Sequence, residues 1–158
     1  MDCSRLGYFP DDAIEFPPEE RLRERPVAVV ECAQEIPCNP CADACPVGAI
    51  SVGDNINRKP RVDFRRCTGC GLCLGACPGL AIFLIQRRDD TGWVTLPYEL
   101  TPPAQGEKVQ LLDRRGEPVG EGTVEKILRL KKHDRTLLLT LRMNGEWIYR
   151  VRGFRSLS

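Results

Sequence analysis

The residues of this chain most suited to chemistry are its cysteines, and four of them have a spacing specific to one kind of site. Residues 67–78 read CTGCGLCLGACP, so two residues separate Cys67, Cys70 and Cys73, and Cys77 follows after three more, directly before a proline. This is an iron–sulfur ligation pattern, in which three thiolates of one loop bind one cluster and the fourth binds the other cluster of a pair. The segment therefore predicts a [4Fe–4S] site.

Two other uses of cysteine fit this segment less well. Structural zinc sites usually pair two short knuckles across a spacer, whereas four cysteines in one short loop would crowd a single tetrahedral ion. Disulfides belong mainly to exported proteins, and the chain begins Met1-Asp2-Cys3-Ser4 without an apolar signal segment. We therefore expect the cysteines to be metal ligands and the protein to be cytoplasmic.

The cysteine pattern occurs a second time, 32 positions earlier in the chain. The matching residues are Cys38 with Cys70, Cys41 with Cys73, and Cys45-Pro46 with Cys77-Pro78. The residues that follow also match, because both motifs continue into an Ala-Ile pair. A repeat of this size predicts two structural halves related by a pseudo-two-fold axis.

The repeat is broken at one position. The residue 32 positions before Cys67 is Glu35, and the first motif instead has its additional cysteine three residues earlier, at Cys32. This displacement is close to one helical turn of about 3.6 residues, so a slightly longer loop could return the Cys32 sulfur to the same iron. The expected ligands are Cys32, Cys38, Cys41 and Cys77 for cluster 1, and Cys67, Cys70, Cys73 and Cys45 for cluster 2. In the alternative, Cys32 is not a ligand, and cluster 1 is [3Fe–4S] or borrows Glu35 or Cys3. Cys3 is otherwise expected to have no metal role.

The elements that must hold these loops are short strands and helices within residues 27–86. Residues 27–31 and 81–85 are apolar runs of β type, and we expect them to pair with each other. A hairpin is expected within 49–64, around a Gly-Asp-Asn turn. The glycines of the 67–78 motif are expected to let backbone N–H groups approach the cluster sulfides, which helps to set the reduction potential.

The segments on either side of this domain have a different composition. Residues 1–26 are proline-rich and acidic, which predicts an extended N-terminal arm that either wraps its own domain or holds a partner subunit. Residues 87–106 begin with the charge run Arg87-Arg88-Asp89-Asp90 and contain three prolines, so we expect a linker there.

The C-terminal residues 107–158 have the pattern of a small β domain. Four or five strand-like runs separated by turns predict a small all-β barrel or meander, with the last strand at 147–151. Asn144-Gly145 is the strongest short hairpin signal in the chain. His133 is the only histidine and lies in a charged turn, where we expect it to be exposed and not to be a ligand. The expected fold class is α+β.

Composition and charge limit the functions that remain. The formal net charge is only +1 over 158 residues, which argues against a nucleic-acid-binding surface. No apolar run reaches the roughly 18 residues of a membrane span. No phosphate-binding or dinucleotide-binding glycine motif occurs either, so flavin and nicotinamide are expected on other chains. Two clusters, each of which accepts one electron, would form an electron path.

The stretch from Cys38 to Ile85 resembles the bacterial two-[4Fe–4S] ferredoxins. The resemblance depends on the cysteine motifs, on the proline after each fourth cysteine and on the repeated Ala-Ile endings. It covers about a third of the chain and implies the ferredoxin-like β-α-β-β-α-β fold. The sequence departs from that family at the first cysteine, which concerns the ligation of cluster 1 alone.

A narrower resemblance extends over residues 31–41 and 67–82. Within them, Glu31-Cys32, residues 36–41 (IPCNPC), residues 67–71 (CTGCG) and residues 77–82 (CPGLAI) look like the small ferredoxin-like subunits of multi-subunit, FAD-dependent amino-acid dehydrogenases. That group acts on proline, hydroxyproline, sarcosine or opine-type substrates. The resemblance implies an FAD-containing dehydrogenase partner, a companion [2Fe–2S] subunit and a hetero-oligomer. It further implies that the chain is no enzyme by itself but the electron-transfer subunit of an oxidoreductase complex.

Two other functions compete with this one at the level of the sequence. A freely diffusing ferredoxin with a β appendage would be a stable monomer when it is expressed alone. An iron–sulfur redox sensor would lose or convert a cluster in air as part of its response. The near-neutral charge, the additional β domain and the N-terminal arm favour a fixed subunit over both.

Overall fold

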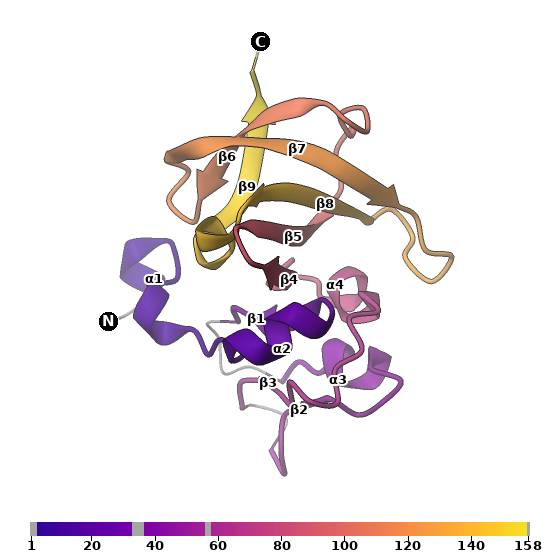
Figure 1. Ribbon diagram of the computed structural model, residues 1–158. Coiled ribbons are helices and arrows are strands. Elements are labelled where there is room, and N and C mark those ends of the chain that lie inside the picture. Colours follow the sequence, from indigo (N-terminus) through magenta and orange to yellow (C-terminus); the bar gives the residue numbers. More distant parts are fainter. Residues whose placement is uncertain (1–2, 33–36, 56–57, 158) are drawn as a thin grey trace.

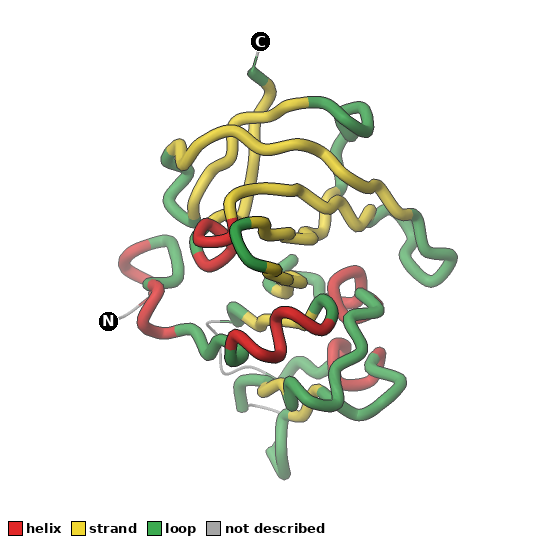
Figure 2. Tube along the Cα trace, viewed as in Figure 1, coloured by secondary structure: helices red, strands yellow, loops and turns green. Residues whose placement is uncertain are grey.

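The computed structural model describes residues 3–32, 37–55 and 58–157 of the chain. The fold is mixed, with a dominant sheet and few helices. Most strands gather in one half of the molecule, while short helices and loops make up most of the other (Figure 2). None of the helices in the described ranges has the length and apolar character that crossing a membrane requires.

The half that is drawn below in Figure 1 contains the cysteine loops. In chain order its elements are β1 (Val27–Val30), α3 (Pro40–Ala44), β2 (Ile50–Ser51), β3 (Arg61–Val62), α4 (Leu72–Ala76) and β4 (Ile82–Arg88). This is the β-α-β-β-α-β order that the ferredoxin resemblance implies. β1 pairs antiparallel with β4, and β2 pairs antiparallel with β3. Both pairings expected from the sequence, of 27–31 with 81–85 and within 49–64, are therefore confirmed.

A seven-stranded sheet, counted over the described residues, joins this half to the rest of the chain. Its remaining strands are β5 (Thr91–Tyr98), β6 (Lys108–Asp113), β7 (Pro118–Leu128), β8 (Leu137–Asn144) and β9 (Val151–Ser156). The strand order is β1-β4-β5-β8-β7-β6-β9, and neighbouring strands are antiparallel. The sheet curls (Figure 1), which brings β5 close to β9. The ring centroids of Tyr98 in β5 and Phe154 in β9 are 5.2 Å apart.

The structure differs from the linker expected at 87–106. The charge run 87–90 ends β4 and forms its turn into β5, which lies between β4 and β8 in the sheet. Pairing with β4 ends at Thr95, so Pro97, which lacks an N–H group, has a partner only in β8. The apolar side chain of Val94 is fully buried. Burial in the sheet thus outweighs the breaker residues that suggested a linker.

The end of β8 also differs from the sequence expectation of a hairpin at Asn144-Gly145 and a strand at 147–151. A 3-10 helix, η2 (Gly145–Tyr149), occupies this stretch. Asn144 has a φ of −60° instead of the positive φ of a two-residue hairpin turn. Its side chain accepts a hydrogen bond from the Glu146 N–H at 3.0 Å. Asn144 therefore caps η2, and β9 begins only after that helix.

The N-terminal arm folds back on its own chain and is not extended throughout. It contains α1 (Cys3–Leu6), η1 (Asp11–Ala13) and α2 (Glu19–Glu24). α2 packs on β4, and its Leu22 is fully buried in the common core. The ring of Phe16 meets that of Tyr149 edge-on, with centroids 5.1 Å apart. Of the two interpretations of the arm, these contacts favour the one in which it wraps its own domain.

Replacing Leu22 by alanine is expected to lower the free energy of unfolding by about 2–5 kcal/mol, because a fully buried leucine leaves a cavity. Urea unfolding of anaerobically purified protein, followed by tryptophan fluorescence, measures the change. The control is Leu6→Ala, at a leucine of the same arm that is 37% exposed, with an expected change within about 0.5 kcal/mol. Equally small changes in both variants would contradict a docked arm.

Candidate iron–sulfur site

Two short helices carry the corresponding cysteines of the two motifs. Cys41 lies in α3 and Cys73 in α4, and both are buried. Each helix ends at the following cysteine, and the backbone angles there are nearly equal: φ −76° and ψ 111° at Cys45, φ −76° and ψ 114° at Cys77. α3 and α4 pack against each other. The repeat in the sequence is therefore also a repeat of backbone conformation.

The four cysteines predicted to bind cluster 1 lie around one small cavity. This cavity is lined by Cys32, Cys38, Cys41 and Cys77, together with Val30, Ile82, Arg58 and three prolines. Burial raises the pKa of the Cys41 thiol to about 11; the Ala42 N–H offsets part of this rise, and the sulfurs of Cys77 and Cys38 add to it. The alternative ligand Glu35 and the side chain of Cys3 lie outside the described part of the structure.

The other three cysteines predicted to bind cluster 2 lie near Cys73. Burial raises the pKa of the Cys73 thiol to about 12, and repulsion by neighbouring thiolates contributes further. These neighbours are Cys67, Cys70, Cys41 and Cys45. Three of them belong to the set predicted for cluster 2, and Cys41 belongs to the set predicted for cluster 1. Thiolates this close repel one another unless positive charge lies among them.

Backbone N–H groups donate to the sulfurs of Cys67, Cys45 and Cys77. The donors are Ala28 to Cys67 (3.4 Å), Ala49 to Cys45 (3.2 Å) and Ala81 to Cys77 (3.4 Å). The last two bonds occupy equivalent positions in the two halves of the repeat. Although burial acts to raise the pKa of Cys45, N–H groups of residues 47–50 bring it below the ordinary value. Such bonds stabilise a thiolate and tune the potential of a cluster that it holds.

Arg21 is a residue of this site that sequence reasoning missed. α2 places the Arg21 side chain against the loop that leads into Cys67, where only 6% of the residue is exposed. Its guanidinium donates to the carbonyl oxygens of Phe64 (2.6 Å), Arg25 (2.8 Å), Pro26 (3.3 Å) and Cys67 (2.8 Å). Burial lowers the pKa of Arg21, and the Cys67 thiolate opposes this effect. No sequence signal distinguishes Arg21 from the other arginines of the charged arm.

The C-terminal strands pack directly on the cluster 2 loop, and two of its glycines make room for them. A side chain at Gly71 would collide with Leu138 of β8, and one at Gly75 would collide with the ring of His133. The expectation that His133 is exposed was wrong, because only 9% of it is exposed. Its Nε2 donates to the Leu72 carbonyl oxygen at 3.0 Å. The segment between β7 and β8 thus folds back onto α4.

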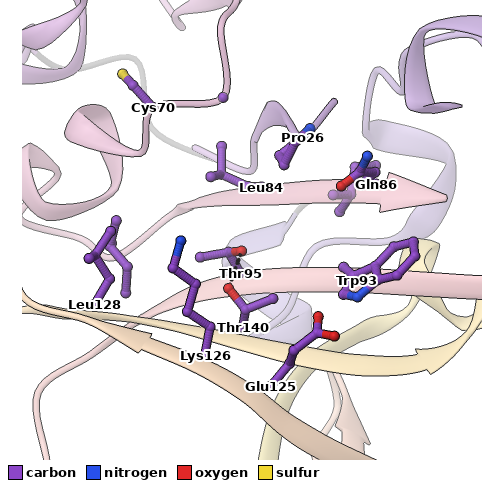
Figure 3. A pocket seen from close by; sticks show the side chains of 13 residues that line it. Pro26, Cys70, Leu84, Gln86, Trp93, Thr95, Glu125, Lys126, Leu128 and Thr140 are labelled. Atoms are coloured by element: carbon purple, nitrogen blue, oxygen red, sulfur yellow. Dashed lines mark hydrogen bonds between the residues drawn. The ribbon is translucent and has the colours of Figure 1, made fainter. Parts of the chain in front are cut away.

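A pocket of about 210 Å³ opens beside Cys70, the exposed member of the eight motif cysteines (Figure 3). The sulfur of Cys70 points away from Trp93, which stands at the other end of the pocket. Between them, the hydroxyl groups of Thr95 and Thr140 share a hydrogen bond of 2.8 Å. The loops of the cysteine half and strands β5, β7 and β8 all contribute to the lining.

The arrangement of the sulfurs suits iron–sulfur clusters. The eight motif cysteines are reduced thiols, and soft thiolate ligands are the ones that such clusters select. Within the described residues, no three His, Cys, Asp or Glu side chains converge closely enough to hold a single metal ion. Thiolates around a cubane each bind a different iron, so they need not meet at one point.

Comparison with known proteins agrees with this chemistry over part of the chain. Residues 36–81, less than a third of the chain, match a family described as a 4Fe-4S dicluster domain. An uncharacterized ferredoxin of Methanocaldococcus jannaschii is 40% identical over 72 residues, which is 44% of this chain and 43% of that protein. No solved structure matches.

Two further relatives are parts of larger assemblies. Pyruvate synthase subunit PorD of Methanocaldococcus jannaschii is 40% identical over 52 residues, or 33% of this chain and 58% of that protein. A component of an ion-translocating oxidoreductase complex of Methanosarcina acetivorans is 41% identical over 49 residues, or 31% of this chain and 17% of that protein. The chain thus covers less than two thirds of each of these relatives, and the similarity supports a ferredoxin-type iron–sulfur segment within it.

Proposed function

We propose that the chain is an electron-transfer subunit that holds two [4Fe–4S] clusters and relays single electrons between a flavin-containing dehydrogenase and an acceptor. The observation that carries this proposal is the grouping of the eight motif cysteines. Four of them line one cavity, and three others surround Cys73 closely enough to raise its pKa. The match of residues 36–81 to a 4Fe-4S dicluster domain supports the same chemistry.

These two groups support the ligand assignment that we propose. Cluster 1 is assigned to Cys32, Cys38, Cys41 and Cys77, and cluster 2 to Cys67, Cys70, Cys73 and Cys45. Each cluster then takes three ligands from one motif and one from the other, which is the usual exchange in two-cluster ferredoxins. Cys32 is assigned as a ligand because it lines the same cavity as the other three cysteines of its group.

Residues around the proposed clusters stabilise negative charge on the cysteine sulfurs and fix the loops that carry them. An iron–sulfur cluster supplies reversible one-electron chemistry when it is bound. The N–H groups of Ala28, Ala49 and Ala81 stabilise negative charge on the sulfurs that they face. Arg21 fixes the backbone of the cluster 2 loop through the Cys67 carbonyl. The contact between α3 and α4 keeps the two cysteine groups adjacent.

The proposed partner is an FAD-containing dehydrogenase subunit, with a companion [2Fe–2S] subunit in a hetero-oligomer. The resemblance of residues 31–41 and 67–82 to the small subunits of amino-acid dehydrogenases supports this partner. The names of two relatives, as subunits of a pyruvate synthase and of an oxidoreductase complex, support a fixed place in a larger assembly. Because Cys70 is the exposed motif cysteine, cluster 2 is the cluster proposed to exchange electrons with the partner.

Anaerobically purified protein is expected to accept about two electrons per chain, one for each cluster. Stepwise titration with dithionite, followed by the loss of visible absorbance and by EPR, measures the uptake. The double variant Cys70→Ser/Cys73→Ser should accept about one electron, because it removes two ligands of cluster 2. An uptake of one electron by the unchanged protein would contradict a two-cluster relay.

The Cys32→Ala variant tests the one assigned ligand that lies outside the regular motif spacing. It is expected to lose about one iron per chain and to show a [3Fe–4S] EPR signal after oxidation, because cluster 1 would keep three thiolates. Iron analysis and EPR measure both effects. Cys3→Ala is the matched control, for which iron content and EPR should equal those of the unchanged protein. Two full [4Fe–4S] signals in Cys32→Ala would exclude Cys32 as a ligand.

Affinity purification of the tagged chain from its native cells tests the proposed partner. The eluate is expected to contain a second polypeptide with bound flavin, detected by its fluorescence after acid release. Addition of the dehydrogenase's amino-acid substrate should then reduce the clusters, as observed by EPR. Recovery of the chain as a flavin-free monomer would instead favour a diffusing ferredoxin.

A further inference from the structure

The carboxylate of Glu31, the residue directly before Cys32, is held by two buried arginines from the C-terminal half. Arg152 of β9 donates from Nε to Glu31 Oε1 at 2.6 Å, and Arg114 of the β6–β7 turn donates from Nη2 at 2.7 Å. The three side chains are only 4–7% exposed. Arg114 Nη1 also contacts Asp11 of the N-terminal arm at 2.8 Å. Three distant parts of the chain thus meet at Glu31.

A second connection to the lining of the cluster 1 cavity begins at the backbone of Glu31. Its N–H donates to the Ala81 carbonyl oxygen at 2.8 Å. The Ala81 N–H in turn donates to the Cys77 sulfur at 3.4 Å. Glu31 is therefore covalently linked to one proposed ligand of cluster 1, Cys32, and is joined to another, Cys77, through two hydrogen bonds.

The contacts of Arg152 fix the position of its guanidinium beside Glu31. Its guanidinium lies 5.1 Å from the ring centroid of Phe83 in β4, and Nη1 donates to the carbonyl oxygens of Ile148 and Val151. Nη2 is buried and has no hydrogen-bond partner among the described residues. Because a buried charge without its counterion is strongly unfavourable, Arg152 holds the Glu31 carboxylate in one position.

We propose that Glu31 is a positioning residue for cluster 1 and that the C-terminal strands hold it in place through Arg152 and Arg114. The inference rests on the proposed two-cluster function. Cys32 departs from the regular motif spacing, so its sulfur needs a fixed point in the chain beside it. The Glu31 ion pair supplies that point, and it makes the appended β strands part of the cluster 1 site.

The test is the stability of cluster 1 in Glu31→Gln, which keeps the size and an acceptor oxygen of the side chain but removes its charge. Loss of iron from cluster 1 to a chelator is expected to be about 10–100-fold faster than in the unchanged protein, which is the factor by which loss of a residue that orients metal ligands typically lowers metal affinity. EPR should show a [3Fe–4S] signal from cluster 1 and an unchanged signal from cluster 2. Arg152→Gln should have the same effect, and Arg152→Lys should restore part of the stability.

Glu15→Gln is the matched control, because Glu15 forms an exposed ion pair with Arg61 at 3.6 Å. Its rate of iron loss should equal that of the unchanged protein. Equal rates in Glu31→Gln and Glu15→Gln would overturn the positioning role and leave the two-cluster function intact. Loss of both clusters together in Glu31→Gln and Arg152→Gln would also overturn it, since that result indicates general destabilisation. Absence of iron–sulfur signals from the unchanged protein would instead refute the proposed function.

Discussion

The main constraint on this structure is the close approach of cysteine sulfurs that would carry negative charge as metal ligands. Eight cysteines occupy two loops and two short helices, and Cys41 and Cys73 are buried at the centre of their groups. Burial and mutual repulsion raise the pKa values of both thiols, so the protein alone does not favour several charged sulfurs there. Bound iron would supply the compensating positive charge, and its binding free energy would then contribute to folding. The grouping of eight thiols in these loops is suited to a metal site with thiolate ligands.

A second constraint is that the appended strands are part of the same sheet as the cysteine loops. β4 leads by a short turn into β5, and Leu138 and His133 from the C-terminal half fill space left by Gly71 and Gly75. The Glu31 ion pair joins the two halves on the side of cluster 1. The ferredoxin-type segment is therefore held by contacts near both proposed clusters, which suits a subunit whose clusters must keep fixed positions.

Local patterns predicted the parts of the fold that depend on nearby residues. The motif spacing predicted the cysteine groups, and apolar runs predicted the pairing of β1 with β4. The sequence did not reveal β5, because the prolines and charges of residues 87–106 suggest a linker. The burial of Val94, which favours a strand there, becomes known only from the folded sheet. Asn144 was misread for a similar reason, since the same residue type favours a hairpin turn and a helix cap. Arg21, His133 and Arg152 act through contacts with distant residues, which no local pattern encodes.

The measurement that tests the central claim most directly is a combined analysis of iron, acid-labile sulfide and Mössbauer spectrum on the anaerobically purified, unchanged chain. The account predicts about eight irons and eight sulfides per chain, with all iron in [4Fe–4S] environments. A colourless protein with zinc in place of iron, or one with about four irons per chain, would contradict it.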